Sequence, residues 1–329
     1  MKNKLYICYT YYHLYVSLLE NLNNETIGKN YLILTDHMNE SKNLIEKIQK
    51  YNIFKKIFYV KDLELKKKVL SNPLNCLFYK FVLKKIFEKE NKELSLLKNN
   101  LEINMFLDST TTSHYFMYKY SDINLIEDGT MIYYPRKMVL KDYIYFLLGI
   151  PKRVGRDKRI KNIYVQTPKK LPKDILKKGK LLNLKEIETK ISFKDKNILF
   201  DIFSFNTSYL DNTTGKRCLI LTQPLSEMNL VTENEKIQIY QDIINDYKNY
   251  DIFIKKHPRD KTNYPFDCIY LNKNFPIELI KFLPNRTFSK IIAIESSAIF
   301  NLNEVSETIN LGYQINKKLY KNMMKDKKI

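Results

Sequence analysis

The sequence predicts an α/β protein made of two successive domains, each a parallel sheet covered by helices. Short apolar runs alternate with helical patterns in both halves of the chain, which is typical of parallel strands joined by crossover helices. Polar residues suited to ligand binding follow several runs, at the carboxyl ends where open α/β sheets hold ligands. Since both halves carry such residues at strand ends, we expect two Rossmann-like domains facing a central cleft. Clefts between domains are preferred ligand sites.

The first half of the chain contains the clearer strand patterns. A helix to about Leu22 follows the first strand, with Thr10 as its N-cap. Strand, helix and strand with short joins between residues 103 and 126 indicate a parallel pair. We predict strands at Leu5–Tyr9, Tyr31–Thr35, Ile57–Val60, Ile103–Leu107 and Asp122–Ile126.

Residues 61–100 are rich in lysine and predict one or two amphipathic helices. The simpler interpretation is a helix that faces the core and carries lysines on its outer face. Docking on an acidic membrane surface is the alternative, and it would place the protein on the inner face of the membrane.

Residues 151–190 have weak periodicity and several proline, glycine and lysine residues, as linkers do. We therefore expect a first domain at 1–155 and a second at 156–329, with a strand near Asn162–Gln166. The tail from Lys317 is expected to be helical, and its return to the first domain stays open. Further strands are predicted at Cys218–Thr222, Ile252–Lys255, Cys268–Leu271, Lys290–Glu295 and Glu307–Leu311.

The composition limits the partners and the compartment. The formal net charge of +20 favours an anionic partner such as a nucleotide, nucleic acid, acidic glycan or membrane surface. The four cysteines are scattered, which disfavours a zinc site and a disulfide framework. The start lacks a secretory apolar run, and no stretch of 18 apolar residues occurs. We expect a cytoplasmic protein, and a homodimer stays open.

Three loops carry candidate chemistry. His257 and Pro258 follow an apolar run and lie among cations, although a basic surface turn would look the same. Ser296 and Ser297 follow another strand and open a helix, where backbone N–H groups form an anion site or merely cap the helix. Glu127–Gly129 follows a strand in the first half. Its carboxylates could supply a general base, or the Asp-Gly pair could simply form a turn.

Together these loops fit one reaction. A cationic His257 and the two serines would hold a phosphate leaving group, while a carboxylate of the first half takes a proton from a hydroxyl. The sequence has no Asp-x-Asp motif to coordinate a divalent metal, so we expect no metal site.

The motifs Glu127-Asp128-Gly129, Lys256-His257-Pro258 and Glu295-Ser296-Ser297-Ala298 occur in the order found in bacterial GT-B sialyltransferases. The chain resembles glycosyltransferase family 52, whose members sialylate lipooligosaccharide and capsule, and Thr10–Leu14 is similar to that family's start. The resemblance implies a GT-B fold, CMP-N-acetylneuraminic acid as donor, inversion at the sugar carbon and no metal or other cofactor.

The resemblance also implies roles for single residues. Asp128 would be the general base, with Glu127 as the reserve choice, and His257 would contact the CMP phosphate. Donor-binding residues would be Gly129, Gln223, Pro224, His257, Pro258, Ser296 and Ser297, and the acceptor side would include Thr10 and Tyr11.

Two other functions remain as alternatives. Another cytidine-nucleotide-dependent transferase of cell-surface polymers, such as a polysialyltransferase or a glycerophosphotransferase, would carry similar motifs. A basic, tyrosine-rich protein that binds single-stranded nucleic acid is the non-enzymatic alternative, although no RNA-binding motif occurs.

Overall fold

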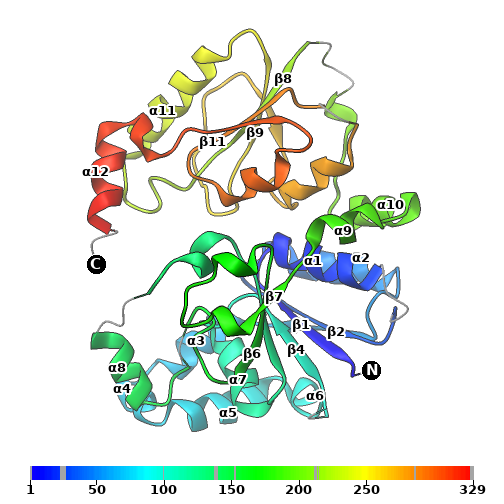
Figure 1. Ribbon diagram of the computed structural model, residues 1–329, viewed down its shortest axis with the longest axis vertical. Coiled ribbons are helices and arrows are strands. Elements are labelled where there is room, and N and C mark those ends of the chain that lie inside the picture. The colour runs from blue at the N-terminus through cyan, green and yellow to red at the C-terminus, as the bar shows by residue number, and fades with distance from the viewer. Residues whose placement is uncertain are drawn as a thin grey trace. The chain divides into compact units, whose positions relative to one another are not determined.

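The computed structural model describes residues 2–22, 27–98, 100–136, 140–151, 153–210, 213, 215–284 and 287–326. The chain divides into two units, Met1–Ile202 and Phe203–Ile329, and each unit is built on one parallel sheet (Figure 1). The predicted α/β class with two successive sheets is therefore confirmed. Among the residues described, no helix is long and apolar enough to cross a membrane.

The sheet of the first unit has seven strands in the order β3-β2-β1-β4-β5-β6-β7, and all neighbouring strands are parallel. Its strands are short and mostly buried, as expected for a sheet covered on both faces. They are β1 Lys4–Cys8, β2 Tyr31–Thr35, β3 Lys56–Val60, β4 Glu102–Met105, β5 Ile123–Ile126, β6 Ile160–Val165 and β7 Gly179–Leu181.

Helices cover both faces of this sheet (Figure 1). On one face α3, α5 and α7 contact one another, and on the other face α1 contacts α9 and α10 while α2 contacts α10. The helices are α1 Tyr11–Leu22, α2 Ser41–Gln49, α3 Asp62–Val69, α4 Pro73–Leu77, α5 Tyr79–Glu90, α6 Lys92–Ser95, α7 Thr111–Lys119, α8 Leu140–Leu147, α9 Leu184–Thr189 and α10 Phe193–Ile202.

The lysine-rich region supplies core-facing helices. In α5, Leu83 and Phe87 are fully buried, whereas Lys84 and Lys85 are exposed. Phe87 stacks on Tyr115 of α7 with ring centroids 3.8 Å apart. The amphipathic prediction for residues 61–100 is thus confirmed, and the outer face of these helices is the one that carries the lysines.

The boundary expected after residue 155 is wrong. Residues 160–181 contribute β6 and β7 to the first sheet, and the division falls between Ile202 and Phe203. Asp108, which follows β4, accepts hydrogen bonds from the backbone N–H groups of Val154 and Gly155 at 2.9 and 2.7 Å. The turn at Val154 and Gly155 therefore belongs to the first unit, because the buried carboxylate of Asp108 holds it there.

The second unit has five parallel strands in the order β10-β9-β8-β11-β12. They are β8 Arg217–Leu221, β9 Asp251–Lys255, β10 Ile269–Leu271, β11 Lys290–Ala293 and β12 Glu307–Asn310. The two long helices are α11 Glu233–Asp246 and α12 Lys317–Asp326. A capping box begins α11, in which Thr232 and Glu235 bond each other's backbone N–H groups.

The last helix packs on its own unit. Leu319 of α12 is fully buried in the core of the second unit. Lys318 pairs with Glu235 of α11 at 2.7 Å, and the Asn322 amide donates to the Leu230 carbonyl oxygen. This helix therefore stabilises the second unit.

Strand order changes direction at one place in each sheet. In the first sheet this point lies between β1 and β4, and in the second it lies between β8 and β11. The loops that follow such neighbouring strands diverge, so the carboxyl edge there is open to ligands. The candidate residues of both halves follow strands at or beside these two points.

Candidate functional site

His13 is the central buried group at the carboxyl edge of the first sheet. It lies in the first turn of α1, where Thr10 caps the helix by accepting a hydrogen bond from the His13 N–H. Its Nδ1 accepts a hydrogen bond from the Tyr9 N–H at 3.1 Å, and its ring stacks on Phe106 at 4.4 Å. A neutral imidazole that accepts at Nδ1 carries its proton on Nε2.

Asp128 lies beside this proton. Its Oδ1 is 3.0 Å from Nε2 of His13, and its side chain is 34% exposed whereas that of His13 is fully buried. The two atoms are within ion-pair distance, although Nε2 makes no hydrogen bond of standard geometry with a described residue. A buried imidazole therefore supports a carboxylate that remains open to solvent on its other side.

The glycine after Asp128 is required by the backbone. Gly129 has φ 71° and ψ −166°, a conformation that side chains with a Cβ rarely adopt. The chain turns there into a short 3-10 helix, Thr130–Tyr133. Gly129 thus sets the direction of the chain directly after Asp128.

Glu127 has a different environment from its neighbour. It is buried, and its Oε2 accepts hydrogen bonds from the Tyr133 hydroxyl at 2.8 Å and from the Gln166 N–H at 2.6 Å. Burial raises the pKa of Glu127, and these two bonds oppose the shift. The Glu127 carboxylate therefore joins the ends of β5 and β6 and is less available to a substrate than that of Asp128.

The two residues expected on the acceptor side are largely occupied by structural contacts. Tyr11 is 5% exposed and its hydroxyl donates to the Asn39 carbonyl oxygen at 2.8 Å. Thr10 is half-buried, and its hydroxyl is the N-cap of α1. Thr10 lies at the sheet edge next to His13, whereas the Tyr11 side chain is turned into the protein.

A second histidine–carboxylate pair occupies the same edge. His37 follows β2, and its Nε2 is 3.0 Å from Oδ2 of Asp62 at the start of α3. The other oxygen of Asp62 accepts a hydrogen bond from the Thr112 N–H at 2.6 Å, which caps α7. These bonds lower the pKa of Asp62 although burial opposes them. His13, His37 and Asp62 are not among the site residues predicted from the sequence.

His257 is the candidate ligand-binding side chain of the second unit. It follows β9, and its backbone N–H donates to the hydroxyl of Thr222 after β8 at 3.3 Å. Its Nδ1 accepts a hydrogen bond from the Arg259 N–H at 3.1 Å, so the proton of the neutral ring lies on Nε2. The loop thus holds the imidazole with one donor nitrogen available to an acceptor.

The charge state of His257 differs from the expectation. Burial lowers its pKa to about 4, and the nearby Arg259 and Lys255 add to this shift. The cationic imidazole predicted from the sequence is therefore wrong for the free protein at neutral pH. A neutral Nε2–H still donates a hydrogen bond to a phosphate oxygen, and a bound phosphate would raise the pKa.

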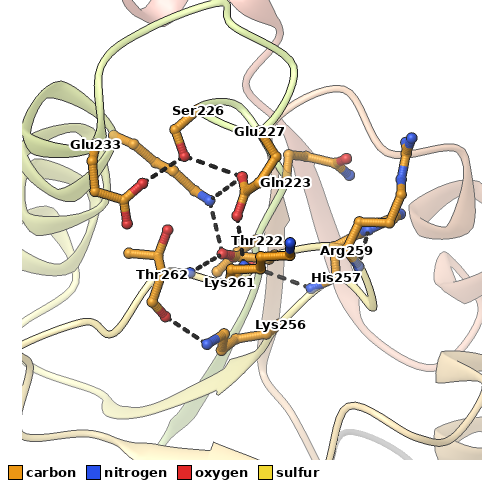
Figure 2. A network of polar contacts seen from close by, with 12 residues as sticks. Thr222, Gln223, Ser226, Glu227, Glu233, Lys256, His257, Arg259, Lys261 and Thr262 are labelled. Atoms are coloured by element: carbon orange, nitrogen blue, oxygen red, sulfur yellow. Dashed lines mark hydrogen bonds and ion pairs between the residues drawn. The ribbon is translucent and has the colours of Figure 1, made fainter. Parts of the chain in front are cut away.

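A buried polar network fixes this loop (Figure 2). Lys236 of α11 and Asp260 are both fully buried, and Nζ lies 2.7 Å from Oδ1 of Asp260 and 2.9 Å from Oε2 of Glu227. Asp260 also accepts hydrogen bonds from the Thr222 hydroxyl and the Thr262 N–H. Because every oxygen of Asp260 has a partner, the turn from His257 to Thr262 is rigidly tied to β8.

The expected cations around His257 are used in different ways. Lys255 is buried with Nζ 4.6 Å from the centroid of the Phe275 ring, and burial lowers its pKa to about 8. Lys256 donates to the Thr262 carbonyl oxygen. Arg259 and Pro258 are exposed. Only part of this positive charge is therefore exposed.

Gln223 and Pro224 follow Thr222 at the end of β8. The Gln223 N–H donates to the buried Tyr240 hydroxyl at 2.6 Å, which holds the backbone in place. Its side chain is half-buried, whereas Pro224 is buried. Gln223 thus has the more accessible side chain of the two.

Ser296 lies across the strand-order switch from Thr222, since β11 pairs with β8. Ser296 is half-buried and precedes the 3-10 helix Ser297–Leu302, whose first turn it does not cap through its side chain. The regular helix expected here is thus a six-residue 3-10 helix, which has poorer hydrogen-bond geometry than an α-helix. The side chain of Ser297 lies outside the described residues.

In the part of the chain that the structure describes, no three His, Cys, Asp or Glu side chains are placed to hold a metal ion. The Asp128 carboxylate is suited to proton transfer, and the His257 imidazole is suited to hydrogen bonding to an anion.

The comparisons with known proteins agree with this arrangement. Two parallel α/β units with polar side chains at their carboxyl edges define a protein of the doubly wound α/β class. Residues 66–318 match the sequence profile of glycosyltransferase family 52, and the chain belongs to this family. It is therefore a transferase for which the family implies a nucleotide-sugar donor and an acceptor. An uncharacterized protein of Haemophilus influenzae is 31% identical over 238 residues, which are 70% of this chain and 76% of that protein.

Two solved structures have a similar fold. The S. aureus MnaA–UDP structure has a TM-score of 0.54 and 12% identity, and the match covers 100% of this chain and 89% of that one. The UDP-GlcNAc 2-epimerase of Methanocaldococcus jannaschii, in complex with UDP-GlcNAc and UDP, has a TM-score of 0.50 and 12% identity, covering 98% and 92%. These matches confirm the GT-B type fold predicted from the sequence.

Proposed function

We propose that the chain is an inverting, metal-independent sialyltransferase that moves N-acetylneuraminic acid from CMP-N-acetylneuraminic acid to a galactoside-terminated acceptor of lipooligosaccharide or capsule. The observation that carries this proposal is the partly exposed carboxylate of Asp128 supported by the buried His13. A carboxylate held in this way is suited to accept a proton from a substrate hydroxyl.

In the proposed reaction the acceptor hydroxyl oxygen attacks the anomeric carbon of the sialyl group. The bond between that carbon and the phosphate oxygen breaks, and CMP leaves with the electron pair. Asp128 takes the hydroxyl proton. Attack from the face opposite to the leaving group inverts the configuration, so a single displacement needs one base and one stabilised leaving group.

His257 serves the leaving group in this proposal. Its Nε2–H donates to the phosphate of the donor, because Nδ1 already accepts from the Arg259 N–H. A neutral donor in a half-buried loop stabilises charge that develops on the phosphate without a metal ion. We propose Gln223 and Ser296, at the carboxyl edge of the same sheet, and Gly129 of the first unit as further donor-binding residues.

The assignment of the base to Asp128 is supported by the contrast with Glu127. Glu127 is buried and bonded to Tyr133 and Gln166, whereas Asp128 is 34% exposed. Removing Glu127 would loosen the join between β5 and β6, so loss of activity in a Glu127 variant is expected to accompany loss of stability.

The first test is the donor itself. Purified protein should release CMP from CMP-N-acetylneuraminic acid when a galactoside is supplied, and thermal unfolding should shift upward with that donor. The same measurement with CDP-glycerol distinguishes a glycerophosphotransferase. A shift with CDP-glycerol alone would reject the sialyltransferase proposal and retain the transferase class.

The nucleic-acid hypothesis makes an opposite prediction. A binder of single strands would take up oligonucleotides with a steep dependence on salt and without any effect of the sugar nucleotide. Family membership favours the transferase. Competition between an oligonucleotide and CMP-N-acetylneuraminic acid in the same binding assay would separate the two.

A further inference from the structure

The first unit carries an unusual exposed apolar face. Leu74 and Leu77 of α4 are 63% and 60% exposed, and Phe78 and Phe81 at the start of α5 are 61% and 72% exposed. On α8, Leu147 is 82% exposed. Single exposed apolar side chains are ordinary, but a group of this size on neighbouring elements indicates an interaction surface.

These elements are neighbours in the fold. Tyr118 of α7 lies between them, since its hydroxyl donates to the carbonyl oxygen of Gly149 just after α8 at 2.8 Å. On the other side, Nζ of Lys80 in α5 is 5.5 Å from the centroid of the Tyr118 ring. Figure 1 shows α4, α5 and α8 at the same end of the first unit. These three helices therefore lie together at one end of the first unit, and each of them carries exposed apolar side chains.

Lysines surround this apolar group. Lys80 and Lys84 line a hollow of about 360 Å³ together with Lys119, Glu88, Tyr115 and Tyr118. Between residues 66 and 98 the chain has nine lysines and three glutamates. Burial lowers the pKa of Lys119 in the hollow, whereas Lys80 and Lys84 are exposed. The face thus combines apolar side chains that protrude with cations that can reach anions beside them.

We propose that this α4–α8 face, made of Leu74, Leu77, Phe78, Phe81, Ile144 and Leu147 with Lys80, Lys84 and Lys85, docks on the surface of an anionic phospholipid bilayer. The apolar side chains enter the boundary between headgroups and acyl chains, and the lysines contact lipid phosphates. The helices lie on the membrane and do not cross it, because none of those described is long and apolar enough.

The charge distribution favours a bilayer over a second copy of the chain. In a symmetric dimer the α4–α8 face of one copy would pack on the α4–α8 face of the other. The lysines Lys80, Lys84 and Lys85 of the two copies would then come close together. Like charges in contact oppose such an interface. An anionic lipid surface instead neutralises all of them.

The apolar composition favours a bilayer over nucleic acid. Single-stranded nucleic acids bind through aromatic platforms on which bases stack. Four of the six exposed apolar residues of the face are aliphatic, namely Leu74, Leu77, Ile144 and Leu147, and the other two are Phe78 and Phe81. Branched aliphatic side chains offer no stacking plane, whereas they partition well into acyl chains.

This inference goes beyond the proposed transferase activity and does not depend on the donor. If the chain used another sugar nucleotide, the α4–α8 face would be unchanged. Conversely, an enzyme active on a soluble galactoside but unable to bind vesicles would leave the proposed function intact. The two proposals can therefore fail separately.

The test is flotation of the full chain with vesicles. We expect the protein to float with vesicles of equal parts phosphatidylcholine and phosphatidylglycerol at low salt, and to stay behind with phosphatidylcholine alone. The double variants Phe78→Ser/Phe81→Ser and Lys80→Glu/Lys84→Glu should each bind at least about tenfold more weakly. These side chains are exposed, so thermal unfolding should be unchanged.

A matched control exists on α10. Phe193 is 79% exposed and Lys194 beside it is exposed. The variants Phe193→Ser/Lys194→Glu and Phe81→Ser/Lys84→Glu make the same chemical changes and alter the net charge equally. Equal vesicle binding by these two variants would overturn the proposal, as would equal binding of the wild type to both kinds of vesicle.

A fluorescence measurement gives a second readout. The chain has no tryptophan, so Phe81→Trp introduces one reporter on the α4–α8 face and Phe193→Trp introduces one on α10. On addition of anionic vesicles, emission of the first should shift to shorter wavelength and that of the second should not. A doubled mass in light scattering that the Phe78→Ser/Phe81→Ser variant abolishes, without any vesicle effect, would assign the face to a second copy and overturn the proposal.

Discussion

The carboxyl edges of the two sheets use the same pair of groups in opposite ways. In the first unit a fully buried imidazole, His13, supports a carboxylate that is 34% exposed, Asp128. In the second unit a fully buried carboxylate, Asp260, fixes the loop that presents the imidazole of His257. In each unit the buried group has its partners inside the protein, and the accessible group is left to meet a ligand.

The difference lies in what the buried group needs. His13 is buried with its Nδ1 accepting a hydrogen bond from the Tyr9 N–H and its ring stacked on Phe106. Asp260 carries a charge and therefore requires Lys236, which is itself fully buried. A buried charged pair is costly to break because one partner is left unpaired in a poor solvent. Substitutions in the Asp260–Lys236 pair of the second unit should therefore mainly lower the free energy of unfolding. Substitutions in the His13–Asp128 pair of the first unit should mainly lower turnover.

The largest effect is expected at Asp128. Asp128→Asn keeps the shape of the side chain and removes its basicity, so kcat should fall about 10²–10⁴-fold. Because a base acts mainly in the transition state, the Kd for CMP should stay within about twofold. Steady-state turnover and calorimetric titration with CMP measure the two quantities.

His257→Gln is the contrasting variant for that prediction. It should weaken CMP binding as well as turnover, since the imidazole is expected to touch the phosphate. An Asp128→Asn enzyme with full kcat would remove this carboxylate from the mechanism. A His257→Gln enzyme with unchanged affinity for CMP would remove the imidazole from the donor site.

The next effect is on stability and concerns Lys236. Lys236→Met leaves Asp260 buried without its counter-charge, so the free energy of unfolding of the second unit should fall by about 3–5 kcal/mol. Adding Asp260→Asn should recover part of this loss, because the unpaired charge is then gone. Urea unfolding of the single and double variants measures the coupling.

Lys248 gives the matched control for this measurement. It is exposed just after α11, and Lys248→Met should change the free energy of unfolding by less than about 0.5 kcal/mol. If Lys236→Met were as mild as this control, the buried network would not be what fixes the His257 loop.

The contrast between the two edges also explains what sequence could predict. Most strands were found because short apolar runs are buried on both faces of a parallel sheet. Asp128 and His257 could be proposed as site residues from the sequence because each lies two residues after the end of such a run. The boundary was missed because β7 has only three residues, Gly179–Leu181, with no apolar pattern.

The supporting groups were beyond reach of pattern reasoning. Lys236 lies on an amphipathic helix whose lysines are expected in solvent, and it is buried because α11 covers the Asp260 loop. The neutral state of His257 was missed since neighbouring cations in the sequence suggested charge without showing burial. His13 could have been noticed as a histidine three residues after the N-cap Thr10, at the edge that also holds Asp128.

A smaller effect follows from the pKa of His257. Burial lowers this pKa from its ordinary 6.5 to about 4. Between these values the unfolded chain binds a proton that the folded chain does not, so stability falls as pH decreases through this window. His257→Gln should reduce that loss by about 2 kcal/mol, as measured by urea unfolding at several pH values. Parallel pH profiles for wild type and variant would show that His257 is not held neutral.

The smallest effect is expected at His13, which acts through Asp128. His13→Gln retains a donor for the carboxylate but loses the stacking on Phe106, so kcat should fall about tenfold, as expected for the loss of one interaction of about 1.4 kcal/mol. In the Asp128→Asn background the same change should cost no further activity, because the group that His13 positions is already inactive. Measuring kcat for the two single variants and the double variant distinguishes positioning from general weakening. Equal losses in both backgrounds would mean that His13 contributes to the fold and not to the carboxylate, and the opposition between the two sheet edges would then hold only for the second unit.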